Sequence, residues 1–326
     1  MRFGFDDDQL AFRDAARDLL DKECPSDVVR AAGEAPPGRL DRGVWDRLAA
    51  MGVLATLVPE DGGGLGLDER SLVLVLEEAG RAGLPHPLVE TAAVAAPLLP
   101  TLAGDVGMIA SDLGGPHVAC AADADRLLLH DPVGGGLHLV DPRDPGVTLT
   151  PVATVDPGRR AATVAWAPHP DTLVTADPAA VAAARDRGAW GAAALLVGLG
   201  RRMLDLTVAY VGERHQFGVP VGSFQAVKHR LADAHKDLAF ARPAVQRAAH
   251  SLATGAATTG RDVAMAKALA SDAARGAGRA ALQCHGAIGY TVEHDLALYL
   301  KRTWALAVAW GDAAHHRDRV ATAIGI

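Results

Sequence analysis

Hydrophobic positions recur at helical spacing over the first hundred residues. Leu10, Phe12, Ala16, Leu19 and Leu20 follow an acidic start, and the run ends before a proline at position 25. This spacing predicts a helix there. The same pattern predicts helices over 44–51, 68–82 (with Asp68 as the N-cap and Ser71 as the alternative) and 92–102, joined by Gly- and Pro-rich loops at 31–41 and 59–66.

The pattern changes between residues 105 and 175. Short apolar runs are separated by Gly, Pro and Asp; they cover 108–109, 118–121, 127–129, 137–140, 147–152 and 162–166. Strands bounded by turns at this spacing predict a small antiparallel β unit, and Gly134–Gly136 is typical of a hairpin turn.

Long apolar-faced helices return in the last part of the chain. They are predicted over 178–210, 224–253, 261–286 and 296–309, and Gly311-Asp312 interrupts the last one before it resumes toward residue 323. Helices of this number with short loops favour an antiparallel four-helix bundle. The predicted fold class is therefore mostly α, with an N-terminal helical domain (1–104), a small β domain (105–175) and a C-terminal bundle (176–326).

Composition narrows the class of protein. The 326 residues are 49% hydrophobic but only 4% aromatic, and the abundance of alanine favours closely packed helices. The net charge of -7 argues against a nucleic-acid partner, and no apolar stretch is long enough to predict a membrane span or a secretory signal. Three distant cysteines (Cys24, Cys120 and Cys284) predict neither a metal site nor a disulfide framework. A soluble, cytoplasmic protein is expected.

Two segments contain residue types that are unusual for the surface of a helical bundle. In residues 213–225 an arginine, two glutamines and two phenylalanines surround a Gly/Pro loop between helices. A guanidinium and free helix N-terminal amides both attract phosphate oxygens. Residues 283–291 form the end of a helix and a glycine-containing turn. The alternative interpretation of residues 283–291 is a simple C-cap with a loop. The alternative role of Arg214 is an ion pair with Glu213 or Asp205.

In this order, the two segments resemble the acyl-CoA dehydrogenase family. The matching stretches are Arg214-His-Gln-Phe-Gly-Val-Pro-Val with Phe224-Gln225, and Gln283-Cys-His-Gly-Ala-Ile-Gly-Tyr-Thr; the turn at 59–66 and Glu77-Glu78-Ala-Gly resemble the family's N-terminal domain. The resemblance implies an acyl-CoA thioester substrate and FAD bound at a subunit interface of a homodimer, a homotetramer or an assembly with a homologous partner subunit. It implies cofactor contacts for Arg214, Gln216, Phe217, Gln225, Gln283, Gly286 and Ala287.

The resemblance breaks at the catalytic base. The family reaction removes a proton from the acyl α-carbon while a hydride moves from the β-carbon to the flavin, and a glutamate takes the proton. At one usual position this chain has Trp310 or Gly311, and the nearest acid is Asp312. At the other it has Gly188, with Asp186 two residues earlier.

The middle region departs from the family as well. The flavin-contacting loop is replaced by residues 121–126, and the chain is shorter than is typical of the family, mainly in this region. Three hypotheses follow. The chain is a dehydrogenase with Asp312 as an atypical base, a non-catalytic subunit that completes a partner's FAD site, or a family fold that serves another flavin reaction or binding role in a biosynthetic pathway.

Overall fold

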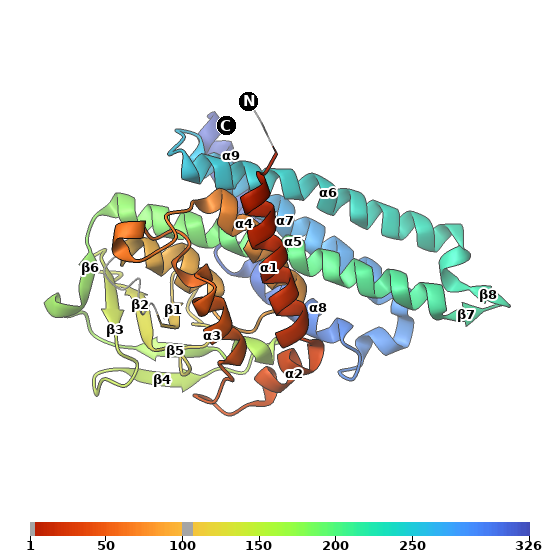
Figure 1. Ribbon diagram of the computed structural model, residues 1–326, viewed down its shortest axis with the longest axis horizontal. Coiled ribbons are helices and arrows are strands. Elements are labelled where there is room, and N and C mark those ends of the chain that lie inside the picture. The colour runs from red at the N-terminus through yellow and green to blue at the C-terminus, as the bar shows by residue number, and fades with distance from the viewer. Residues whose placement is uncertain (1–3, 100–106) are drawn as a thin grey trace.

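A computed structural model describes residues 4–99 and 107–326, and its elements follow the predicted helical, β, helical order (Figure 1). The helices are α1 (Asp7–Glu23), α2 (Ser26–Glu34), α3 (Gly43–Ala50), α4 (Glu69–Ala82), α5 (Pro178–Glu213), α6 (Gln225–Ala253), α7 (Thr259–His285), α8 (Leu296–Val308) and α9 (Ala313–Ile324). The strands are β1 (Ile109–Ser111), β2 (Arg126–His130), β3 (Leu137–Val140), β4 (Thr148–Pro151), β5 (Ala162–Ala165), β6 (Leu173–Thr175), β7 (His215–Gln216) and β8 (Val219–Pro220). The mostly α fold class is confirmed.

Side-chain caps define where the N-terminal helices begin. The Asp6 carboxylate accepts a hydrogen bond from the Gln9 amide at 2.8 Å, while the Gln9 side chain accepts one from the Asp6 amide. This reciprocal pair satisfies two of the free donors at the start of α1. Asp68 caps α4 as predicted, because its carboxylate accepts from the Arg70 amide at 2.9 Å.

Two predictions in this part were wrong. Residues 31–34, expected in a loop, belong to α2, which buries Val29 and Ala32 and ends before the prolines. In place of a regular helix over 92–102, the chain forms a π-helix over Val89–Ala95 and a 3-10 turn over Ala96–Leu98; residues 100–102 lie outside the described ranges. Tertiary packing of this buried segment overrides its local preference for an α-helix.

The β region is mixed and not purely antiparallel. A four-stranded sheet has the order β1-β2-β3-β6, and β4 pairs with β5 separately. The predicted hairpin joins β2 to β3, with His130 opposite Leu137. The prediction of an antiparallel unit was wrong for β1, which pairs parallel to β2 with Ile109 opposite Arg126. Residues 118–121, predicted as a strand, form only one bridge, from Val118 to Ala162.

Residues 121–126 attach the β region to the N-terminal helices. The Asp123 carboxylate receives two hydrogen bonds from the Arg160 guanidinium, at 2.7 and 2.9 Å, and both side chains are almost fully buried. Asp125 pairs with Arg42 at 2.8 Å and also accepts from the Met108 amide. Residues 121–126, which the resemblance aligns with the family's flavin-contacting loop, therefore form structural ion pairs.

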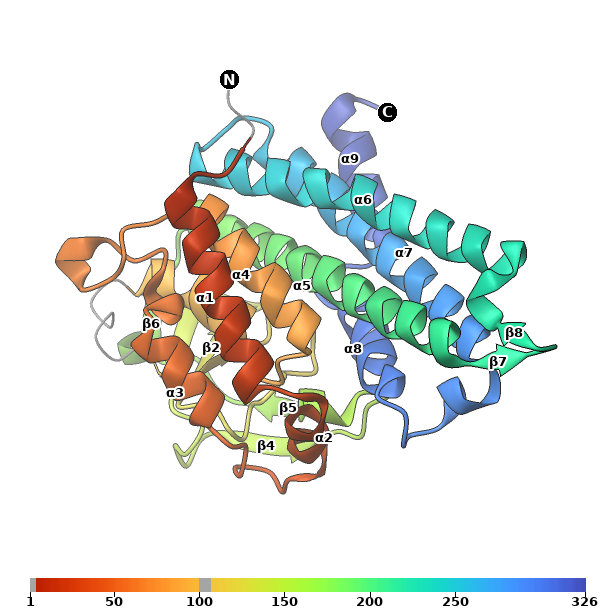
Figure 2. The ribbon, with the colours of Figure 1, turned by 45° about the vertical axis from the view of Figure 1, so that its right-hand side comes forward.

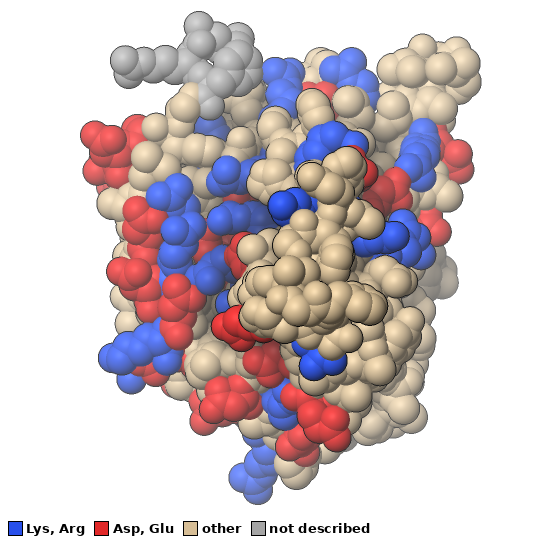
Figure 3. Space-filling view, turned by 90° about the vertical axis from the view of Figure 1, so that its right-hand side faces the viewer, with Lys and Arg blue, Asp and Glu red and all other residues tan. Residues whose placement is uncertain are grey.

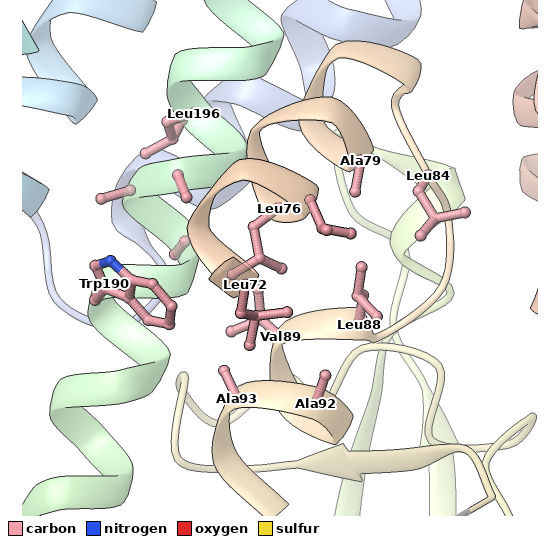
Figure 4. Packing of buried hydrophobic residues seen from close by; sticks show 14 of the residues in the cluster. Leu72, Leu76, Ala79, Leu84, Leu88, Val89, Ala92, Ala93, Trp190 and Leu196 are labelled. Atoms are coloured by element: carbon pink, nitrogen blue, oxygen red, sulfur yellow. The ribbon is translucent and has the colours of Figure 1, made fainter. Parts of the chain in front are cut away.

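Helix α5 lies at the centre of the molecule, between α4 and α7 (Figures 1 and 2). Figure 4 shows side chains of α4 and of the segment after it packed against α5, with Trp190 and Leu196 on the α5 side. Glycines let these two helices approach closely. A Cβ atom added at Gly198 would lie 1.9 Å from the Glu77 carbonyl oxygen, and one at Gly80 would lie 2.2 Å from the Leu195 carbonyl oxygen.

The two adjacent glutamates of α4 are buried, and each pairs with an arginine from another helix. Glu77 accepts from Arg242 of α6 at 2.7 Å, and Glu78 accepts from Arg17 of α1 at 2.7 Å and from Arg81. Burial raises the pKa of Glu77. Burial also opposes ionisation of Glu78, but the hydrogen bonds from its arginines outweigh it, and its pKa lies below the ordinary value. These pairs fix α1 and α6 against α4.

Candidate functional site

The first segment of interest forms a projecting hairpin at one end of the bundle. Helix α5 ends at Glu213, β7 and β8 form a two-stranded hairpin, and α6 begins at Gln225. Phe217 and Gly218 make the turn, with φ angles of 52° and 79°. Ser223 donates to the Pro220 carbonyl at 2.7 Å and does not cap α6, whose first turn has no side-chain cap.

The polar and aromatic side chains of this hairpin face solvent. Among the described residues, Arg214 has no ion-pair or side-chain hydrogen-bond partner, so neither Glu213 nor Asp205 neutralises it. Phe217 is 92% exposed, and its ring meets Phe224 edge to face with centroids 6.3 Å apart. Gln225 is exposed on the first turn of α6. An exposed cation beside exposed rings is a surface suited to a ligand or partner.

The second segment lies next to the first. Helix α7 ends at His285, and Gly286 follows with φ 65° and ψ -140°, a conformation open to glycine. The Tyr210 ring of α5 stacks on His285 with centroids 4.4 Å apart, and its hydroxyl donates to the His285 carbonyl at 3.4 Å. Tyr210 thus joins the two segments, which are more than 50 residues apart in the sequence.

This end of the molecule exposes apolar side chains. In addition to Phe217, Tyr290 is 77% exposed, Val292 61% and Val208 57%. Gln283, Gly286 and Ala287 are also exposed here. Figure 3 looks at this end and shows an uncharged projection in the centre with Lys, Arg, Asp and Glu around it.

The two positions where the family places its base lie against each other. The Trp310 indole covers Gly188, so closely that a Cβ atom at Gly188 would lie 2.1 Å from Cζ3 of the ring. The other edge of the indole meets Gly114, where an added Cβ would lie 2.9 Å from Cε2. Trp310 is 7% exposed and has a φ of 61°, which is rare for a bulky residue. An aromatic ring therefore lies at the contact between the two positions where the resemblance predicts a carboxylate.

Buried polar side chains hold the turn that carries this indole. The Trp310 amide donates to the Gly114 carbonyl at 2.9 Å, and its carbonyl lies 2.8 Å from Nε2 of the buried His316. The fully buried Lys267 donates to the Gly311 carbonyl at 2.9 Å and to Ser271 and Ala307. Burial lowers the pKa of Lys267 to about 7. This network stabilises the unusual backbone of the turn.

The two nearby acids have structural partners. Asp312 is exposed and is the N-cap of α9; its carboxylate accepts from the His315 amide at 2.8 Å, which lowers its pKa. Asp186 accepts from Arg319 of α9 at 2.7 Å. A helix cap with a lowered pKa is a weaker base than a free carboxylate, and the cap directs Asp312 toward the backbone of α9.

Trp310 also lines two cavities. One, of about 440 Å³, lies on the side of α9 and includes Asp186 and His315. The other is only about 40 Å³, and Glu90, Arg159 and Cys120 line it. Burial raises the pKa of Glu90. Sequence reasoning missed Glu90; its only signal was an acid inside the apolar run of residues 88–98.

Comparison with known proteins identifies the family of this chain. Residues 6–101 match the model of the acyl-CoA dehydrogenase N-terminal domain, and residues 180–325 match that of the acyl-CoA dehydrogenase C-terminal domain. The chain belongs to the acyl-CoA dehydrogenase family. It is 33% identical over 311 residues to acyl-CoA dehydrogenase IpdE2 of Mycolicibacterium smegmatis, covering 92% of this chain and 93% of that one. It is 34% identical to acyl-CoA dehydrogenase IpdE2 of Mycobacterium tuberculosis, with 91% of each chain covered.

Solved structures share the fold of this acyl-CoA dehydrogenase family member. A chain of the ChsE4-ChsE5 complex from Mycobacterium tuberculosis superposes with a TM-score of 0.89 at 24% identity, covering 100% of this chain and 99% of that one. The butyryl-CoA dehydrogenase of Megasphaera elsdenii superposes with a TM-score of 0.87 at 22% identity, with full coverage of both chains. In the described part of the chain, no helix is long and apolar enough to cross a membrane.

Proposed function

We propose that this chain is a non-catalytic subunit of a heteromeric acyl-CoA dehydrogenase, in which it completes the FAD site of a homologous partner. The observation that carries the proposal is the Trp310 indole packed on Gly188, at the two places where the family has its base. The exposed hairpin and turn at the other end of the bundle retain the family's cofactor-contacting residue types. The chain thus combines a closed acyl site with an open cofactor-facing end.

The residues at this open end fit the ADP portion of FAD. Arg214 is an exposed cation without a partner among the described residues, and it can pair with the pyrophosphate. The first turn of α6 offers uncapped amides beside Gln225, and Gly286 admits a ligand close to the backbone. Gln216, Phe217, Gln283 and Ala287 would supply the remaining polar and stacking contacts. When bound, FAD supplies the hydride acceptor of the family reaction.

The acyl end of this chain does not fit a thioester beside a base. The indole leaves a cavity of about 40 Å³ on the side of Glu90, which is enough for a water molecule and too small for an acyl chain. The cavity of about 440 Å³ on the side of α9 contains Asp186, but that carboxylate is paired with Arg319. Asp312 is used as a helix cap. Asp123 and Asp125, in the segment expected to contact the flavin, are used in ion pairs with Arg160 and Arg42. These features support a partner chain as the source of the base.

The solved relatives are consistent with a heteromer. ChsE4-ChsE5 is a complex of two differently named chains. The Tcur3481-Tcur3483 steroid ACAD, which superposes with a TM-score of 0.84 at 25% identity, also carries two chain names. The exposed Phe217, Tyr290 and Val292 give this chain an apolar surface for such a partner.

A second candidate function is a self-sufficient dehydrogenase. The curated relatives at 33% and 34% identity carry the name acyl-CoA dehydrogenase, which favours it. In that case Trp310 moves on substrate binding, and Asp312 or Glu90 takes the α-proton. The two functions differ in whether any carboxylate of this chain is needed for flavin reduction.

Substitutions in the co-purified heteromer separate these functions. Arg214→Gln removes the charge that would face the pyrophosphate, so FAD affinity is expected to fall about tenfold or more. Asp312→Ala and Glu90→Gln should leave the rate of acyl-CoA-dependent flavin bleaching unchanged. The measurements are FAD titration by fluorescence and stopped-flow absorbance.

The matched control is Arg143→Gln, because Arg143 is an exposed arginine of the β region far from the hairpin in sequence. It should change neither FAD affinity nor bleaching. Loss of bleaching in Asp312→Ala or Glu90→Gln, with FAD still bound, would establish the second function. Unchanged FAD affinity in Arg214→Gln would refute the cofactor assignment.

A further inference from the structure

A large cavity lies away from both the hairpin and Trp310. It measures about 560 Å³ and opens where the ends of α1 and α4 meet the starts of α2 and α8. Figure 2 shows α2 at the lower end of α1. Cavities of this size hold small molecules, and the family pattern and the proposed FAD site use none of its lining residues. Its lining is polar, and three arginines (Arg30, Arg81 and Arg202) contribute to it.

Two of these arginines are already satisfied. Arg30 donates to Asp295 at 2.9 Å and to the backbone of the segment before α8, and Arg81 donates to Asp21 and Glu78. These bonds connect the helices around the cavity. They also neutralise Asp21 and Asp295, two of the three aspartates that line it.

Arg202 differs from the other two. Its Nε atom is buried and has no hydrogen-bond partner, and no carboxylate of the described residues lies within ion-pair distance of its guanidinium. The guanidinium carbon lies over the ring of Tyr299, 5.5 Å from the centroid, within cation–π distance. The buried Nε atom is out of reach of a ligand, but no acceptor among the described residues holds the terminal nitrogens of Arg202, so a ligand in the cavity can accept from them.

Other donors border the same cavity. The Ser26 and Tyr299 hydroxyls lie 3.2 Å apart, and when one donates to the other the second hydroxyl proton stays available. Helix α2 begins there with Pro25 as its N-cap and no side-chain cap. The Val28 and Val29 amides donate to the Pro25 carbonyl, which leaves the Ser26 and Asp27 amides for an anion. A guanidinium, a hydroxyl and helix amides are the donor set that binds phosphate.

We propose that this cavity binds the phosphate group of a sugar phosphate or nucleotide, with Arg202 as the main phosphate contact. Asp27, the remaining aspartate of the lining, has no ion-pair partner among the described residues and can accept from a sugar hydroxyl. That carboxylate disfavours ligands with a high density of negative charge and favours a hydroxyl beside the phosphate. The site is independent of the proposed FAD site.

Isothermal titration of the full chain at low salt tests the site. The probes are inorganic phosphate, ribose 5-phosphate, ADP and adenosine 3′,5′-bisphosphate, with acetate as a carboxylate control. We expect at least one phosphorylated sugar to bind more tightly than phosphate or acetate. Arg202→Gln should weaken that binding about tenfold or more, and Ser26→Ala, which leaves Arg202 in place, should weaken it a few-fold.

Arg143→Gln is the control and should leave the affinity unchanged. A thermal scan of each variant without ligand separates weaker binding from loss of fold. Absence of binding by every phosphate compound to the wild-type chain would overturn the proposal. So would an affinity that both Arg202→Gln and Ser26→Ala leave unchanged, or binding of acetate as tight as that of the sugar phosphates.

Discussion

At the scale of single residues, the proposal that this chain lacks a catalytic base rests on Trp310. Its ring lies on Gly188, so the large side chain at position 310 fits only because residue 188 is a glycine. A side chain at Gly188 would collide with the indole, and a smaller residue at 310 would leave a cavity. The sequence showed that both glutamates are missing, but only the structure shows that the two replacements are packed together.

Gly188→Ala tests this contact. The added Cβ would lie 2.1 Å from Cζ3 of the indole, so the ring must shift and the free energy of unfolding should fall by about 1–3 kcal/mol. In a Trp310→Ala background the same substitution should cost far less, because nothing then occupies the space. Urea unfolding of the four proteins gives the coupling energy.

Gly276→Ala is the control for that cycle. Gly276 lies inside α7 with nothing within 4 Å of an added Cβ, so alanine there should raise the free energy of unfolding by up to about 1 kcal/mol. Equal costs of Gly188→Ala with and without the indole would show that Trp310 does not fill this space.

At the scale of elements, the sequence predicted long helices well and small elements poorly. Alanine-rich periodicity located α5 to α8, and the Gly311-Asp312 step correctly separated α8 from α9. Helix α2 was missed because Gly33 and the prolines after it have the composition of a loop. The parallel pairing of β1 with β2 could not be predicted, since strand partners are chosen by packing and not by local pattern.

The candidate site was predicted in part. The motifs located the hairpin and the turn after α7, but not that Tyr210 joins them or that Arg214 has no partner among the described residues. The burial of Lys267 and the place of Glu90 beside the small cavity were not predictable. Burial of a lysine or a glutamate depends on which helices surround it, and local sequence does not specify those neighbours.

The crossing of α4 and α5 depends on glycine in a way that a substitution can measure. At Gly198 an added Cβ would lie 1.9 Å from the Glu77 carbonyl oxygen and 2.6 Å from the Arg81 amide nitrogen. Both are backbone atoms, so the helices themselves must separate. Gly198→Ala should lower the free energy of unfolding by about 3 kcal/mol in urea titration.

Gly212→Ala in the same helix provides the comparison, since nothing lies within 4 Å of a Cβ there. It should be neutral or slightly stabilising. If the two substitutions had the same effect, close approach of α4 and α5 would not explain the glycine at position 198.

At the scale of the whole molecule, the chain has one closed end and one open end. The proposed acyl side has the Trp310 indole at the expected base positions, and the pairs of Asp123 and Asp125 attach the β region there. The hairpin end (Figure 3) exposes apolar rings, and its Arg214 has no ion-pair partner among the described residues. The short middle region is consistent with this arrangement, because ion pairs within and around it attach it to the N-terminal helices. A partner subunit that carries the base would complete this arrangement.

Flavin stoichiometry with acyl-CoA bleaching tests that claim most directly. The chain is purified alone and in complex with a homologous partner, and FAD per chain and loss of flavin absorbance on adding acyl-CoA are recorded for both. We predict bleaching only in the complex, with one FAD for each pair of unlike chains. Binding of one FAD per chain by this protein alone, bleached by acyl-CoA, would contradict the account.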